Sequence, residues 1–431
     1  MKNFLKLNKL EKVNIWFIYL IYIIFVTLVT IYFTNKFITK YPEIIDNNLD
    51  IILNKIPFAF GNLINNLFYQ NNYTLNDWGM KMHVARLPVV PYLISSLYFF
   101  FKNIYFFLIF KNIIFFSIYF FILFQFIKSF NIKINFLLLL LIPILCNPYN
   151  FTVLLNFVYE DFVIAILIPS LFLSIISKNK FKYIISAIII FVLYLTKVNM
   201  FFLTIIISII IFALEKNKRK IIPIIAVLFA IFTWGFYGLL KTNKFPIGQS
   251  MISINSWNMS HVLNDNFKNF YPKNSVDLIE FPDKHKKFEN EWEFYNFYYQ
   301  KNNEYFLNNK LQVLHNIFLK IKFIFFDIYH DGNQTFKLND NQKILISNID
   351  NKFFLNLSIL ILVLSFYTSV KKREIQKFDL YYFFLLTFYI LPLIIGWATS
   401  KHLVGIFIVS KIYLILKFME KKEFLINKLK F

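Results

Sequence analysis

The sequence predicts an all-α polytopic membrane protein with about 10–11 transmembrane helices and two long extracytoplasmic loops. Of its 431 residues, 58% are hydrophobic and 16% are charged, whereas a soluble protein carries roughly 25% charged residues. The apolar residues fall into blocks of about 15–25 residues, enough to cross a hydrocarbon core of about 30 Å as a helix. These blocks must be helical because lipid cannot satisfy free backbone N–H and C=O groups.

The apolar blocks give the expected order of spans along the chain. We expect spans at 14–35, 104–127, 134–147, 152–177, 181–196, 199–214, 220–240, 351–369, 378–397 and 402–418. Residues 88–102 form a shorter apolar helix that begins at Pro88 and either dips into the membrane or adds a span. The spans divide the chain into an N-terminal membrane module (1–240), a large extracytoplasmic loop (241–350) and C-terminal membrane helices (351–431).

Lysine clusters set the expected topology. They occur at 1–12, 128–133, 178–182, 216–220, 371–377 and 421–430. Ten spans place all of these clusters on one side, which the positive-inside rule assigns to the cytoplasm together with both termini. We therefore interpret the formal net charge of +22 as a topology signal and expect no nucleic-acid partner. The richness in Phe, Ile, Asn and Lys is typical of an AT-rich genome, which favours a prokaryotic inner or plasma membrane.

The first outer loop (36–103) carries the candidate catalytic acids. Residues 43–56 have the periodicity of an amphipathic helix that places Asp46 and Asp50, four residues apart, on one face. Two neighbouring carboxylates repel each other, which raises the pKa of one of them and suits a general base. A solvated polar face on an interfacial helix is the alternative, and a divalent cation held by the pair also stays open.

Arg86 is the candidate phosphate ligand of the same loop. The other two arginines lie in lysine clusters, whereas Arg86 precedes Pro88 at the mouth of the short apolar helix. A guanidinium binds phosphate through a planar fork, and a helix N-terminus favours an anion. An ordinary interfacial anchor that contacts lipid phosphates is the alternative.

Further charged residues stand at the extracytoplasmic ends of the predicted spans. Glu160 and Asp161 fall within an apolar stretch, near the outer end of the span at 152–177, where carboxylates are costly and often functional. Lys197 marks the turn between two spans, and Lys401 and His402 open the last span. We expect the basic residues to contact phosphate. A snorkelling side chain is the alternative for Lys197, and a plain loop pair is the alternative for Lys401 and His402.

Several activities find no motif in the chain. No two histidines have metal-ligand spacing, so we expect no metal site and no cofactor. Phosphate-binding glycine loops, dinucleotide fingerprints and nucleophile elbows are also lacking. Mid-span positions carry few charges, which argues against a flippase with a charged central cavity.

The ordered landmarks resemble the GT-C-fold membrane glycosyltransferases, specifically the protein O-mannosyltransferase-like and aminoarabinose-transferase-like enzymes. The similarity covers nearly the whole chain. It rests on Gly61–Asn66, Ala85–Pro91, Tyr159–Phe162, Tyr194–Val198, Trp234 with Lys244–Gly248, and Ser400–His402.

The resemblance implies an inverting transfer from a polyprenyl-phosphate sugar to a hydroxyl or amine of a glycan, lipid or protein acceptor. Asn54 stands where the family usually has its acid, so Asp50, one helical turn earlier, is the expected base and Asp46 the second choice. Arg86, Lys197 and His402 would stabilise the departing phosphate. A lipid-linked glycan polymerase, ligase or flippase is the alternative function.

Overall fold

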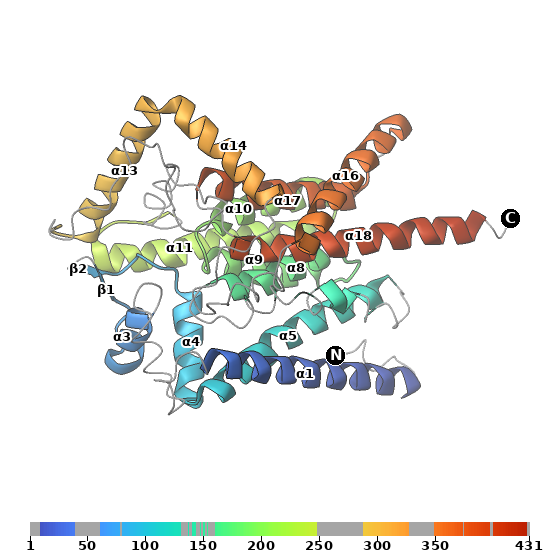
Figure 1. The fold of residues 1–431 in the computed structure, drawn as a ribbon, viewed down its shortest axis with the longest axis horizontal. Coiled ribbons are helices and arrows are strands. Elements are labelled where there is room, and N and C mark those ends of the chain that lie inside the picture. Colours follow the sequence, from blue (N-terminus) through green and yellow to red (C-terminus); the bar gives the residue numbers. More distant parts are fainter. Residues whose placement is uncertain are drawn as a thin grey trace.

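The computed structural model is a mostly helical bundle (Figure 1), and it describes part of the chain. The described residues are 9–38, 61–77, 80–130, 137, 140–143, 147, 150, 153, 160–247, 288–326, 349–373, 375–396 and 400–428. The predicted helix at 43–56, with Asp46 and Asp50, lies outside these ranges. So do most of the predicted span at 134–147 and the first part of the span at 152–177.

Six of the described helices are long and apolar enough to cross a membrane. The helices that provide these stretches are α1 (Lys9–Ile38), α5 (Ile104–Ser129), α11 (Ile222–Thr242), α16 (Ile349–Lys372), α17 (Lys377–Ile395) and α18 (Ser400–Lys428). Five of these helices coincide with a predicted span to within a few residues at both ends. The sixth, α18, begins near the predicted residue but continues to Lys428, beyond the predicted end at 418. The prediction of a polytopic membrane protein is therefore confirmed in its coarse form, whereas the exact number of crossings stays a prediction.

Shorter apolar helices fill the space between the long ones. They are α4 (Val89–Phe100), α8 (Asp161–Ile176), α9 (Lys182–Tyr194) and α10 (Met200–Leu214), with the short 3-10 helix η4 (Lys218–Ile221) leading into α11. A helix of 13 residues extends only about 20 Å, less than the hydrocarbon thickness. These helices are stabilised by protein neighbours. Nearly every side chain of α8 is buried, so α8 is a core helix of the bundle.

Polar elements gather at one end of the bundle. They are α3 (Asn62–Gln70), the strands β1 (Leu75–Asp77) and β2 (Met80–Met82), α13 (Glu291–Asn308) and α14 (Lys310–Phe326) (Figure 1). The strands pair antiparallel with Leu75 opposite Met82. This hairpin departs from the all-α prediction, because strands of three residues are too short to show a period in the sequence.

Helix α18 lies at the centre of the bundle. Its residues from Leu403 to Phe407 and on to Tyr413 include many with no solvent exposure at all. Gly405 lets α18 approach α8 closely, since an added Cβ would lie 3.2 Å from the carbonyl oxygen of Ile164 and 3.3 Å from Cβ of Ile168. The helix that begins near His402 is therefore fixed against the helix that begins at Asp161.

The two ends of the bundle differ in the charged residues that they carry. At the basic end, the last turns of α5, α8 and α10 and residues Leu416–Glu420 of α18 meet the first turns of α9 and α17. Described lysine-cluster residues lie in or beside these turns, namely Lys128, Lys178, Lys180, Lys182, Lys216, Lys218, Lys220, Lys371 and Lys377. The opposite end holds the starts of α4, α8 and α18, together with the turn between α9 and α10.

Candidate functional site

The predicted site residues that the structure describes converge at the end opposite the lysine clusters. Arg86 comes just before α4, and Glu160 and Asp161 stand at the start of α8. Lys197 lies in the turn between α9 and α10, and His402 lies in the first turn of α18. We call these five residues the charged cluster. The side chain of Lys401 lies outside the described part of the structure.

In one half of the charged cluster, Asp161 contacts both Lys197 and His402. Its Oδ1 accepts a hydrogen bond of 2.7 Å from Nζ of Lys197 and lies 3.7 Å from Nε2 of His402. The Asp161 side chain is only 3% exposed, so burying its charge requires a cation close by. Lys197 supplies that cation. An incoming phosphate would therefore have to compete with Asp161 for Lys197.

Arg86 and Glu160 form the other half. Nη1 of Arg86 lies 3.9 Å from Oε1 of Glu160, which is an ion pair but too long for a hydrogen bond. The Arg86 side chain is 27% exposed and the Glu160 side chain 8%. Arg86 is thus the more accessible cation of the charged cluster, and Glu160 is the less tightly held carboxylate. This geometry suits an anion at Arg86 and a proton acceptor beside it.

Backbone contacts fix the position of Arg86. The Tyr73 hydroxyl donates to the Arg86 carbonyl at 2.9 Å, and the amide of Val89 donates to the Leu195 carbonyl at 3.2 Å. The second bond joins the start of α4 to the turn that carries Lys197. Because of these contacts, Arg86 and Lys197 are held on one frame although more than one hundred residues separate them.

Glu291, the first residue of α13, ties the large loop to the same segment. Its two carboxylate oxygens accept hydrogen bonds from the amides of His83 and Val84 at 3.0 and 3.1 Å. Tyr295 donates to the same carboxylate at 3.2 Å. Glu291 is 3% exposed, so these are buried bonds to a charged acceptor and are stronger than neutral ones. The start of α13 therefore clamps the strand that leads to Arg86.

Four aromatic rings stand beside Arg86. Tyr73 stacks on Tyr92 with ring centroids 5.5 Å apart, and meets the ring of Tyr237 edge-on at 5.7 Å. Trp234 stacks on Tyr237 at 5.2 Å. Burial raises the pKa of Tyr73, the two neighbouring tyrosines add to the rise, and Arg86 opposes it, so Tyr73 stays a donor. Tyr73 and Trp234 are buried, so Tyr92, which is 48% exposed, is the ring most open to contact with a sugar.

A polar cavity of about 480 Å³ opens beside the segment that leads to Arg86. Its walls come from β2, the end of α11 and the start of α13, and include Lys81, His83, Lys241, Lys244 and Trp292. Nζ of Lys244 lies 5.3 Å from the Trp292 ring. Two residues separate His83 from Arg86 in the chain, but no residue of the charged cluster lines the cavity. The sequence did not predict this cavity, because its walls come from segments far apart in the chain.

Charged side chains also occur inside the spans, where the sequence led us to expect few. Lys111 of α5 is fully buried, with Nζ 4.2 Å from the ring centre of Phe162. Lys411 of α18 donates to Asp350 at 2.7 Å, and Lys417 lies 2.9 Å from Asp379. The scarcity of mid-span charge is therefore a weaker argument against a flippase than the sequence indicated.

Comparison with known proteins and a search for a metal site assign no function, so the geometry of these residues is the basis for proposing one. Among the residues that the structure describes, no group of three His, Cys, Asp or Glu side chains lies close enough to hold a metal ion. The chain matches no protein-family model, no curated protein and no solved structure. The resemblance to GT-C-fold glycosyltransferases consequently stays a prediction from the landmarks.

Proposed function

We propose that this protein is a membrane glycosyltransferase that moves a sugar from a polyprenyl-phosphate carrier to a hydroxyl or amine acceptor on the extracytoplasmic face. The observation that carries the proposal is the meeting of Arg86, Lys197 and His402 with Glu160 and Asp161. These residues belong to separate segments of the chain. Their convergence at the end opposite the lysine clusters supports an extracytoplasmic active face under the positive-inside rule.

The proposed reaction is a single displacement with inversion. A carboxylate takes the proton of the acceptor group, the acceptor oxygen or nitrogen attacks the anomeric carbon, and the bond from that carbon to the phosphate oxygen breaks. Polyprenyl phosphate leaves with the electron pair, and Arg86 stabilises its charge. Asp50 is the proposed base and Asp46 the second choice. Glu160 is a third candidate because its carboxylate lies beside Arg86.

Reconstitution with a radiolabelled polyprenyl-phosphate hexose and a membrane extract tests the proposal. We expect labelled product from the wild type, and a loss of about 10²-fold or more in Arg86→Ala, as when a donor to developing charge is removed. Arg373→Ala is the matched control, since Arg373 is an exposed arginine at the basic end. Asp50→Asn and Glu160→Gln then identify the base. Full activity in Arg86→Ala contradicts the site, and no transfer from any lipid-linked sugar contradicts the function.

A flippase for lipid-linked glycans is the second candidate, and the observations that favour it are the buried Lys111 and the partly buried Lys411. A flippase moves its substrate between leaflets without breaking the sugar–phosphate bond. Vesicles that contain a labelled lipid-linked sugar distinguish the two functions. Transbilayer movement with the intact lipid recovered supports the flippase, and label found in a new product supports the transferase.

A further inference from the structure

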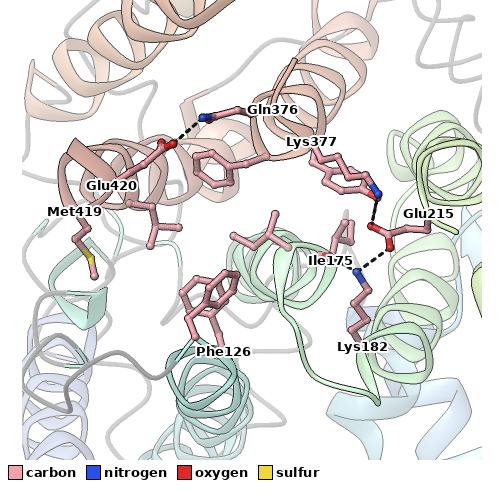
Figure 2. A pocket seen from close by; sticks show the side chains of 13 residues that line it. Phe126, Ile175, Lys182, Glu215, Gln376, Lys377, Met419 and Glu420 are labelled. Atoms are coloured by element: carbon pink, nitrogen blue, oxygen red, sulfur yellow. Dashed lines mark hydrogen bonds and ion pairs between the residues drawn. The ribbon is translucent and has the colours of Figure 1, made fainter. Parts of the chain in front are cut away.

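A second cavity opens at the basic end of the bundle, far from the charged cluster. Its volume is about 520 Å³, within the range of small-molecule sites. Figure 2 shows the side chains around it, contributed by the ends of α5 and α8, the starts of α9 and α17, the α10–η4 turn and residues Leu416–Glu420 of α18. The positive-inside rule places this opening at the cytoplasmic leaflet.

The lining of the cavity is divided into an apolar part and a polar part. The apolar part consists of Phe126, Phe130, Ile175, Ile176, Phe378, Leu416 and Met419. The polar part has Lys182, Glu215 and Lys377 on one side and Gln376 with Glu420 on the other (Figure 2). Such a lining fits a molecule that has a hydrocarbon chain and a polar head.

The carboxylate of Glu215 is already satisfied by the protein. Lys182 lies 3.1 Å from it, and the hydroxyls of Tyr183 and Tyr381 donate to it at 3.0 and 2.9 Å. Burial by itself raises the pKa of Glu215, but Lys182 and the hydrogen bonds outweigh burial and keep the pKa below its ordinary value. Glu215 therefore stays ionised. Its negative charge is compensated by Lys182 and the two tyrosine hydroxyls, which reduces its repulsion of an anionic ligand.

Lys377 is held more loosely than Lys182. Its Nζ lies 3.8 Å from Glu215 and its side chain is 50% exposed. Lys178 does not line the cavity, but its Nζ lies 4.8 Å from the ring centre of the lining residue Phe130. The other carboxylate of the lining, Glu420, accepts hydrogen bonds from Lys417 and Gln376 at 3.2 and 2.7 Å. Both lining carboxylates thus have partners within the protein, whereas Lys377 is a half-exposed cation of the lining.

We propose that this cavity binds one anionic phospholipid from the adjacent leaflet. The phosphate contacts Lys377, and an acyl chain lies along Phe126, Leu416 and Met419. Exposed basic residues of the neighbouring turns strengthen the attraction to an anionic headgroup. The inference does not depend on the glycosyltransferase proposal, because it uses no residue of the charged cluster.

Photo-crosslinking of the full chain in phosphatidylcholine vesicles tests the site. The probe is phosphatidylglycerol with a diazirine in its acyl chain, and peptide mass spectrometry locates the label. We expect label on the peptides that contain Phe126–Phe130 and Leu416–Glu420. Lys377→Gln should lower this labelling about fivefold, the effect of one cation at an anionic lipid surface. Lys371→Gln is the matched control, since Lys371 is exposed at the same end, beside Tyr367, and does not line the cavity.

A second variant tests the apolar part independently of charge. Met419→Trp fills the space of the acyl chain and should abolish label on the α5 peptide. Equal labelling by a diazirine phosphatidylcholine, or equal loss in Lys371→Gln, would overturn the proposal. Displacement of the lipid by an excess of glycerol phosphate would also overturn it, because the site would then recognise a soluble phosphate rather than a lipid.

Discussion

Removing the charge of Asp161 gives the sharpest test of the charged cluster. In Asp161→Asn the amide keeps the size of the side chain but leaves Lys197, whose side chain is 12% exposed, without its carboxylate. Breaking a buried ion pair by removing one partner costs about 3–5 kcal/mol of unfolding free energy. Lys197→Met, which leaves Asp161 with His402 at 3.7 Å, should cost a similar or smaller amount.

The double variant Asp161→Asn/Lys197→Met removes both charges and should cost well under the sum of the single variants. We expect a coupling of about 2 kcal/mol or more, as for directly bonded buried partners. Unfolding of the detergent-solubilised protein by titration with dodecyl sulfate measures all four forms. Additive effects, with a coupling below about 0.5 kcal/mol, would show that the 2.7 Å contact does not hold the two helix ends together.

Three further outcomes follow from other parts of the structure. Burial lowers the pKa of Lys320 from 10.5 to about 7, so between these values the unfolded chain binds a proton that the folded chain does not. Unfolding free energy should therefore rise with pH above 7, by up to about 1.4 kcal/mol per unit, and Lys320→Met should remove this rise in dodecyl sulfate titrations. Gly405→Val should cost about 1–3 kcal/mol in the same assay through overpacking against α8, and Gly405→Ala should cost less. Glu291→Gln should speed amide exchange of residues 80–87 about tenfold or more in hydrogen-exchange mass spectrometry, because an amide oxygen cannot replace both charged acceptors. Unchanged exchange there would show that Glu291 does not clamp the segment.

The helices were predictable because their ends are marked in the sequence. For example, a span was predicted at 199–214 and α10 covers Met200–Leu214; it follows Lys197 and precedes Glu215. Apolar blocks bounded by charged residues leave little freedom in where a membrane helix begins. The strands of the hairpin could not be predicted, since three residues show no reliable alternation.

The sequence indicated which residues belong to the charged cluster, but it did not indicate which acid contacts which base. Arg86, Lys197 and His402 stood out as basic residues at the expected outer ends of helices, and the structure brings them together with Glu160 and Asp161. These pairs depend on how the helix ends pack against one another, and no local sequence pattern predicts that packing. The contact from Glu291 to His83 spans 208 residues and has no sequence signal.

The buried position of α18 has a consequence for how the protein is made. The helices that surround α18 precede it in the chain, so they leave the ribosome earlier. Until α18 arrives, the bundle lacks its central element, and the surfaces that later cover Leu403–Tyr413 must face lipid or water. Insertion of α18 therefore fills a gap between helices made before it, and until then Asp161 and Asp350 lack the His402 and Lys411 contacts that α18 provides.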